Sequence, residues 1–245
     1  MDKILVLQSA AANPPEWIER CLGSVSDWAR MSGYGYQFIN DELFEFVPDW
    51  YLSKIGARTA IAADLARLTW AESLLHAEQA EVVVWMDADV LLFASEAFAV
   101  EISDGPVFGY EYWLQADGNK FKVRKNVHNA YCAFRHGCAT LPFLIEATKR
   151  IIKNVDANFM APQIVGPKLL TSLNNIVGFE LEPRVGAVSP ELHRAIAGED
   201  SGELAKLMGA LPTPMLGANL CSTLSEGRDM DELIDLLAAF KDGLK

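Results

Sequence analysis

The stretch that decides the fold runs from Val82 to Phe93 and reads VVVWMDADVLLF. An apolar run of strand length comes first, Asp87 and Asp89 follow one residue apart, and a second apolar run comes directly after. Isolated carboxylates are costly to bury, so a divalent cation is expected beside them. Mg²⁺ and Mn²⁺ take oxygen ligands, commonly one or two carboxylates together with substrate phosphates. The stretch therefore predicts a metal–diphosphate site at the C-terminal end of a buried strand, where open α/β sheets bind ligands.

A purely structural explanation of the two aspartates is also open. Aspartate is a common turn residue, so a D-x-D triplet can mark a plain strand-to-turn junction. In that case Asp87 begins a turn and Asp89 caps the following segment. The apolar runs on both sides of the triplet favour the metal-binding interpretation.

The composition is that of an acidic globular protein. The 245 residues include 33 Asp and Glu against 21 Lys and Arg, a net charge of −12, and 51% of them are hydrophobic. This length and apolar content suit a single α/β domain over residues 1–245 with a large core. The charge argues against a general binder of nucleic acid or anionic membrane, so local positive charge or metal must meet any anionic substrate.

Nothing in the chain predicts export or membrane insertion. The apolar run at the start is too short for a secretory signal and soon reaches Asn13-Pro14-Pro15. No apolar run approaches the ~20 residues that span a bilayer. The cysteines lack the spacing of a zinc site and are expected to be reduced and mostly buried; they are Cys21, Cys132, Cys138 and Cys221. Together these features predict a cytoplasmic protein.

The hydrophobic periodicity predicts alternating strands and helices. A strand over 3–8, a helix between 14 and 33 and a strand over 36–40 open the chain like the nucleotide-binding half of a parallel sheet. Neither a dinucleotide-binding glycine motif nor a P-loop motif is present. Further helices are expected over about 57–77, 141–152, 168–173 and 229–241, and further strands over 107–113, 128–134 and 176–181. The expected architecture is a mainly parallel sheet with helices on both faces. Residues 182–227 show no periodic pattern, and they could wrap back over the site.

The helix predicted over 57–77 carries a charged pair. Asp64 and Arg67 are three residues apart and therefore project from one helical face. Taken alone, they would be an exposed ion pair that contributes little stability. Because they come just before the strand that leads to Asp87, they are also candidates for gripping a polar ligand.

A basic cluster follows the turn predicted over 116–119, and its members are Lys120, Lys122, Arg124, Lys125 and His128. Two explanations are open. Lysines protect exposed hairpin edges in many proteins, and a basic flap could also lie beside an anionic donor or acceptor. In the preceding strand Tyr110, Tyr112 and Trp113 are candidate walls for a sugar, although aromatic residues in strands more often pack in the core.

Four features between residues 57 and 173 resemble, in order, retaining glycosyltransferases of the GT-A fold. They are AADLAR at 62–67, VWMDADV at 84–90, Asn129 within a strand and VGPKLLT at 165–171. The most similar group has a sugar-binding region with a DXD motif. It includes capsular polysaccharide and initiating mannosyl transferases and the glucosylating clostridial toxins.

The resemblance implies a GT-A-like nucleotide-diphospho-sugar transferase fold and a sugar transferred from a nucleotide diphosphate sugar with retention of the anomer. It implies that Asp87 and Asp89 bind Mn²⁺ or Mg²⁺ with the donor diphosphate and ribose, and that Asp64 and Arg67 contact the donor sugar. Further donor-binding residues are expected at Gln8, Arg58 and Asn129, and a late metal ligand at His193 or Asn219. No catalytic residue is implied, and the acceptor stays open between a glycan, a lipid-linked molecule and a protein.

Two rival functions stay open. A phosphohydrolase of the haloacid dehalogenase type also carries D-x-D after an apolar strand, with the first aspartate as nucleophile. That motif normally opens its domain and continues to Thr or Val, whereas here it begins at Asp87 and the corresponding residue is Leu91. The other rival is a catalytically silent binder of sugar nucleotides, which turnover of a nucleotide sugar would distinguish from an enzyme.

Overall fold

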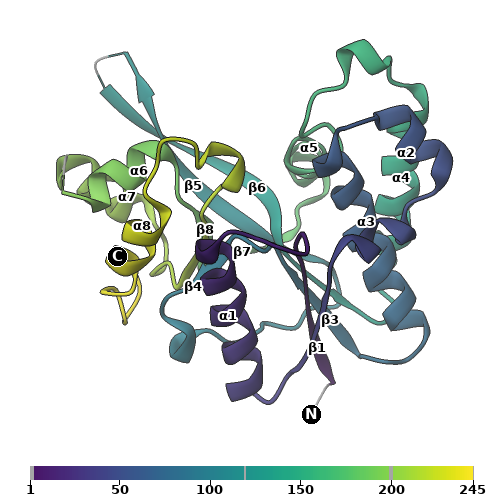
Figure 1. Cartoon of the computed structure of the whole chain (residues 1–245), viewed down its shortest axis with the longest axis horizontal. Helices are drawn as coiled ribbons and strands as arrows, with labels where there is room; N and C mark the ends of the chain where they lie inside the picture. Colours follow the sequence, from purple (N-terminus) through teal and green to yellow (C-terminus); the bar gives the residue numbers. More distant parts are fainter. Residues whose placement is uncertain (1–2, 119, 199–200, 245) are drawn as a thin grey trace.

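The computed structural model describes residues 3–118, 120–198 and 201–244. A six-stranded sheet of order β2-β1-β3-β6-β5-β7 forms its centre (Figure 1). These strands are β1 (Ile4–Ser9), β2 (Gly35–Ile39), β3 (Val82–Met86), β5 (Val107–Asp117), β6 (Lys120–Arg135) and β7 (Glu180–Glu182). A small second sheet has the order β4-β9-β8 and consists of β4 (Val90–Leu92), β9 (Gly217–Asn219) and β8 (Val185–Ala187).

Three of the five pairings in the large sheet are parallel. Strand β1 runs parallel to β2 and β3, and β7 runs parallel to β5, whereas β6 is antiparallel to both β3 and β5. The predicted mainly parallel sheet is thus confirmed, and its order places a switch from parallel to antiparallel pairing directly after β3. The strand order also reverses between β1 and β3, and ligands of open α/β sheets bind outside the carboxyl ends of the strands at such a point.

Helices cover both faces of the sheet. On one face α2 (Asp49–Ile55), α3 (Thr59–His76), α4 (Thr140–Asn154) and α5 (Pro167–Val177) share a core with Val83 and Trp85 of β3. On the other face α1 (Glu16–Met31) packs on Val82, Val84 and Met86. Every residue of β3 is therefore buried, as expected for a strand covered on both sides. The remaining helices, α6 (Pro190–Ile196), α7 (Ser201–Ala210) and α8 (Met230–Leu237), pack together beside β5.

The first strand–helix–strand unit and the helix predicted over 57–77 are confirmed, but the strand predicted over 176–181 is wrong. Helix α5 continues to Val177 and ends at Gly178, whose φ of +67° suits glycine. The apolar side chains of Ile176 and Val177, which suggested a strand, are 79% and 64% exposed. Only the three residues of β7 are extended there.

Residues 182–227, which carry no periodic pattern, wrap back over the end of β3. Their strands β8 and β9 have three residues each, too few to show a period. Three of the described 3₁₀ helices are equally short, η2 (Ser95–Ala97), η3 (Ala157–Phe159) and η4 (Ser222–Leu224), whereas η1 (Asp41–Phe46) has six residues. Strand β9 pairs antiparallel with β4, so Asn219 lies opposite Val90, the residue after Asp89. This return brings the loop after β9 to the site predicted from the sequence.

All four cysteines are free thiols, three of them buried, as the sequence predicts. Among the described residues, no helix is both long and apolar enough to cross a membrane.

Strands β5 and β6 form a long hairpin that projects from the sheet (Figure 1). The turn predicted over 116–119 includes Asn119, which lies outside the described residues. At the base of the hairpin the register shifts between Phe108 and Gly109, and Gly109 lies opposite His128. The His128 ring is buried, and two hydrogen bonds hold it in place. Its Nδ1 accepts from the Ala130 N–H at 3.2 Å, and its Nε2 donates to the Val185 carbonyl oxygen at 2.9 Å. A Cβ atom at position 109 would lie 2.2 Å from this ring, so only glycine fits.

We expect Gly109→Ala to lower the free energy of unfolding by about 2–3 kcal/mol, because the added methyl group must displace a ring held by two hydrogen bonds. Gly23→Ala in α1 is the matched control, since no atom lies within 4 Å of the added Cβ. Alanine favours a helix interior by up to about 1 kcal/mol over glycine, so the control should be neutral or stabilising. Urea denaturation measures both, and equal effects would contradict this packing.

Candidate functional site

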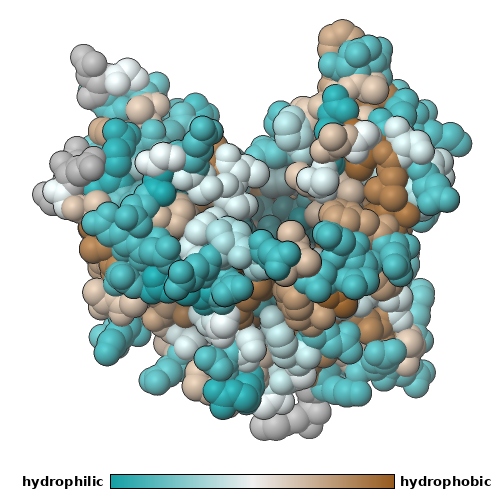
Figure 2. Space-filling view, in the orientation of Figure 1, coloured by the Kyte–Doolittle hydropathy of each residue, from teal (hydrophilic) through white to brown (hydrophobic). Residues whose placement is uncertain are grey.

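A cleft of about 1060 Å³ opens along the C-terminal ends of the parallel strands. Its lining follows the strand order of the sheet, from Asp41 after β2 and Ser9 at the end of β1 to Asp87 after β3, Asn129 in β6 and Glu111 in β5. Figure 2 shows this hollow between the lobe that carries the hairpin and the lobe that carries α2 to α5. The predicted position of Asp87 at a strand end in a cleft is confirmed.

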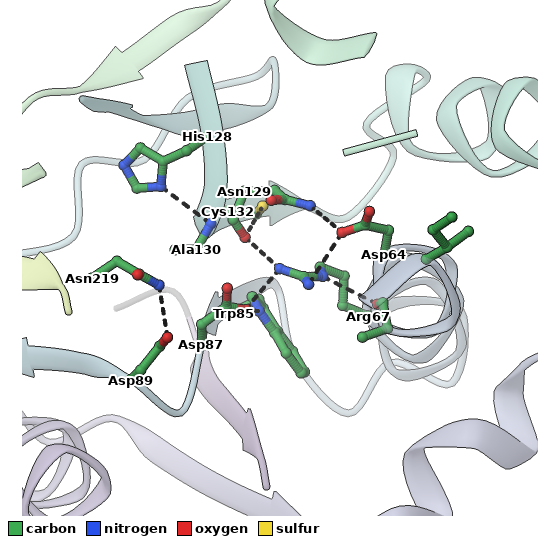
Figure 3. Close-up of polar contacts among 12 residues, drawn as sticks. Asp64, Arg67, Trp85, Asp87, Asp89, His128, Asn129, Ala130, Cys132 and Asn219 are labelled. Atoms are coloured by element: carbon green, nitrogen blue, oxygen red, sulfur yellow. Dashed lines mark hydrogen bonds and ion pairs between the residues drawn. The ribbon is translucent and has the colours of Figure 1, made fainter. Parts of the chain in front are cut away.

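Arg67 is the centre of a hydrogen-bond network beneath this cleft (Figure 3). Its Nη1 donates to Asp87 Oδ1 and to the Asn129 carbonyl oxygen, both at 2.7 Å. Its Nη2 lies 3.3 Å from Asp64 Oδ1, and its Nε donates to the Ala63 carbonyl oxygen at 3.1 Å. One guanidinium therefore connects α3 with the end of β3 and with β6.

Trp85 fixes the other side of this ion pair. Its indole Nε1 donates to Asp87 Oδ1 at 2.6 Å, and the Arg67 guanidinium lies over the ring at 5.1 Å from the centroid. Asp87 Oδ1 thus accepts two hydrogen bonds, whereas no described group donates to Oδ2. With 26% of its side chain exposed, Asp87 can offer Oδ2 to a ligand in the cleft.

Asp89 is buried and is held by the loop that follows β9. Its Oδ1 accepts from Asn219 Nδ2 at 2.7 Å, and its Oδ2 accepts from the Ser222 N–H at 2.8 Å. Burial raises the pKa of Asp89, and the nearby charge of Asp87 raises it further. Two carboxylates that repel each other inside one cleft favour a cation between them. Each Asp89 oxygen keeps a second lone pair for such a ligand.

Asp64 lies behind the wall of the cleft. Asn129 Nδ2 donates to its Oδ1 at 2.7 Å, and a Cβ atom at Gly166 would lie 2.7 Å from its Oδ2. Burial raises the pKa of Asp64 to about 6, although the charge of Arg67 and the bond from Asn129 act in the opposite direction. The described residues that line the cleft include Arg67 and Asn129 but not Asp64. In this structure Asp64 therefore supports its two neighbours from behind.

The alternative interpretation of Asp64 and Arg67 as an exposed ion pair is wrong. Their side chains are only 8% and 7% exposed, and both belong to the network around Asp87. Of the two asparagines expected near the site, Asn129 bonds Asp64 through its side chain and Arg67 through its carbonyl oxygen, and Asn219 bonds Asp89.

Three of the expected ligand-binding residues have other partners. Gln8 is fully buried; its Nε2 donates to the Asp87 carbonyl oxygen at 3.2 Å and its Oε1 accepts from the Tyr36 hydroxyl at 3.1 Å. It therefore fixes the backbone of Asp87, while the neighbouring residues 9–11 line the cleft. Arg58 donates to two carbonyl oxygens, those of Ile55 and Ala157, and does not line the cleft.

His193 is the third correction. It is buried on α6, where its Nδ1 accepts a hydrogen bond from Arg228 Nε at 3.0 Å, and it is not among the residues that line the cleft. A guanidinium bound to the ring nitrogen opposes a metal cation there. In the part of the chain that the structure describes, no three or more His, Cys, Asp and Glu side chains form a metal site. A metal in this cleft would depend on Asp87, Asp89 and a ligand.

Several residues that line the cleft escaped the sequence reasoning. Glu111 and Asn126 face it from the hairpin, and Ser222 reaches it through the return of the chain. The alternation of polar and apolar residues along β5 was the signal for Glu111, because successive side chains of a strand point to opposite faces. No local pattern marks Ser222, which lies 133 positions from Asp89.

We expect Arg67→Ala to lower the free energy of unfolding by about 3–5 kcal/mol, because it leaves Asp64 and Asp87 without their buried cation. The matched control is Arg30→Ala, which removes another Asp–Arg pair three residues apart, with side chains 74% and 66% exposed. An exposed pair of this kind contributes less than about 1 kcal/mol. Urea denaturation compares the two, and a small, equal loss in both variants would contradict the network.

Comparison with known proteins supports the fold. A solved glycosyltransferase involved in the glycosylation of the major capsid of PBCV-1 is similar over 96% of this chain and 98% of its own, with a TM-score of 0.51 and 12% identity. The structure of A197 from STIV aligns with 71% of this chain and 78% of its own at 9% identity, with a TM-score of only 0.31. Neither protein-family models nor curated proteins give a match. The expected α/β fold, similar to that of a glycosyltransferase, is thus confirmed.

Proposed function

We propose that this protein is a metal-dependent glycosyltransferase that takes a sugar from a nucleoside diphosphate sugar. The observation that carries the proposal is the buried Arg67 network, which holds Asp87 beside Asp89 where parallel pairing changes to antiparallel pairing in a large cleft. The fold shared with a glycosyltransferase supports it. The sequence resemblance adds retention of the anomeric configuration to the proposal.

The two aspartates fit Mn²⁺ or Mg²⁺ bound together with a diphosphate. Asp87 keeps Oδ2 without a described donor, and Asp89 keeps one lone pair on each oxygen. A set of two carboxylates leaves most positions of such a cation open for phosphate oxygens and water. Asn219 orients Asp89 through its Nδ2, while its Oδ1 accepts a hydrogen bond from the Cys221 N–H at 2.7 Å. The metal, when bound, neutralises the charge that develops on the departing diphosphate.

Arg67 orients the site more than it holds the sugar. A guanidinium has five N–H donors, and four of them are directed at Asp64, Asp87 and two carbonyl oxygens. At most one remains for a ligand. For the role implied by the resemblance, contact with the donor sugar, Arg67 therefore has at most one N–H group. Its main contribution is to hold the carboxylate of Asp87 in place.

The donor lies over the parallel strands in this proposal. Residues 9–11 at the end of β1, together with Asp41, Leu43 and Phe44 after β2, line that half of the cleft and are suited to the nucleoside. In the reaction the bond from C1 of the sugar to the diphosphate breaks, and the diphosphate leaves with the electron pair. The acceptor oxygen bonds to C1, and its proton passes to the departing diphosphate.

The two rival functions make different demands on Asp87. A phosphohydrolase needs it as the nucleophile, a role left to Oδ2 alone because Oδ1 accepts from Arg67 and Trp85. A silent binding protein would retain the nucleotide without turnover. Release of free nucleoside diphosphate from UDP-, GDP- and dTDP-sugars, and of phosphate from p-nitrophenyl phosphate, distinguishes the three functions.

We expect Asp89→Asn to weaken Mn²⁺-dependent binding of a nucleoside diphosphate by at least about tenfold, or about 1.4 kcal/mol. The amide keeps the volume and one acceptor of the carboxylate but removes its charge. Isothermal titration of UDP, GDP, ADP and dTDP with Mn²⁺, and again with EDTA, is the measurement. The exposed Asp104, which lies outside the cleft, provides the control Asp104→Asn.

Binding that needs Mn²⁺ in the wild type and in Asp104→Asn, but is lost in Asp89→Asn, would support the site. Equal affinity in all three proteins, or binding indifferent to EDTA, would show that the metal site is misplaced.

A further inference from the structure

The cleft extends beyond the proposed donor position, over the hairpin of β5 and β6. From β3 outward its lining passes to Asn129 and then to Glu111 and Trp113. The Asp87 N–H donates to the Ala130 carbonyl oxygen at 2.9 Å, and Ala130 lies two residues from His128 at the base of the hairpin. Asp89, Glu111 and Cys221 all line the cleft. The base of the hairpin is adjacent to the proposed metal site.

The two faces of the hairpin differ in character. Directly paired residues share a face, and the register pairs Glu111 with Asn126 and Trp113 with Arg124. These four residues line the cleft. The alternate residues of the two strands pack with α6 to α8: Tyr112 and Leu114 are buried there, and Tyr110, Phe121 and Val123 are partly buried against them. Of the aromatic residues considered from the sequence, Trp113 faces the cleft, whereas Tyr110 and Tyr112 belong to the core.

Each residue of the cleft face offers a contact that suits a sugar. Trp113 is half-buried and presents an aromatic surface. Asn126 Nδ2 donates to Glu111 Oε1 at 2.8 Å, which fixes both side chains and leaves the remaining amide and carboxylate atoms for hydroxyl groups. Arg124 adds N–H donors further out along the hairpin, and Lys168 and Ser172 of α5 line the cleft with them.

We propose that this face of the hairpin is the acceptor subsite and that its ligand is a carbohydrate. One pyranose ring stacks on Trp113, its hydroxyl groups bind Glu111 and Asn126, and the next part of the glycan reaches Arg124. This inference rests on the proposed function, because the reacting hydroxyl must lie beside a donor sugar held at Asp87 and Asp89. It selects a glycan from the three kinds of acceptor that the sequence leaves open.

The basic cluster noted in the sequence divides between the two faces. Arg124 faces the cleft, whereas its neighbour Lys125 lies on the opposite face with its Nζ 5.1 Å from the centre of the Tyr112 ring. His128 is buried at the hairpin base and is not part of an exposed basic surface. The surface-edge explanation thus fits Lys125, and the functional explanation is retained for Arg124. The two residues form a matched pair for experiment.

The test is binding of the full chain to an array of immobilised glucosides, galactosides, mannosides, rhamnosides and xylosides, with Mn²⁺ and UDP, GDP or dTDP present. Titration calorimetry then measures the best glycan. We expect Trp113→Ala to weaken that glycan by at least about tenfold and Trp113→Phe to restore most of the affinity. Trp50→Ala is the control, because Trp50 is 43% exposed on α2 and lies outside the cleft. Arg124→Gln should weaken the glycan more than Lys125→Gln.

Nucleoside diphosphate affinity, measured in the same variants, separates the two proposals. The subsite is supported if glycan binding falls in Trp113→Ala while nucleotide affinity changes less than about twofold, a small effect on the free-energy scale. It is overturned if Trp113→Ala binds the glycan like the wild type, if no glycan on the array binds, or if nucleotide and glycan affinity fall together. Failure of the wild type to bind any nucleoside diphosphate would instead overturn the proposed function.

Discussion

The contact on which the site depends is the buried guanidinium of Arg67 between Asp64 and Asp87. Removing three charged groups from water is costly, and the cost is offset only when each group finds several well-placed partners. Arg67 meets this condition with carbonyl oxygens of α3 and β6, and Asp64 and Asp87 receive further bonds from Asn129 and Trp85. Because these partners come from separate elements, the network can form only when α3, β3 and β6 have docked. The position of Asp87 is thereby fixed before any ligand arrives.

The strand order supplies the second constraint. Strands β2, β1 and β3 end together at one edge, and the antiparallel strand β6 continues the sheet on the other side of Asp87. The cleft consequently has one half over loops that follow parallel strands and another half over a hairpin face. In the proposed function the donor takes the first half and the acceptor the second. Asp89 lies at that junction and is fastened by a loop from the far end of the chain.

The sequence was informative where several signals coincide. The buried strand before Asp87, the helical spacing of Asp64 and Arg67 and the amphipathic face of α1 all follow from local periodicity. The sequence was misleading where a polar side chain bonds to the backbone. Nothing in the local sequence distinguishes Gln8, which donates to the Asp87 carbonyl oxygen, from a residue that contacts a ligand. His193 and Arg58 failed for the same reason, since their partners come from segments distant in sequence or from their own turn. The hydrogen bond from Asn219 to Asp89 joins residues 130 positions apart, and only the family resemblance suggested it.

The central claim is that Asp87 and Asp89 hold a cation with a nucleotide while Arg67 keeps Asp87 in place. The most direct measurement is a crystal structure of the protein with Mn²⁺ and the nucleoside diphosphate that binds it most tightly, with the metal located by anomalous scattering. We expect a manganese peak bound by Asp87, Asp89 and the diphosphate, with Arg67 still joined to Asp64, Asp87 and Asn129. A nucleotide bound without metal at the aspartates, or an Arg67 side chain that leaves Asp87 to bind the phosphates, would contradict it.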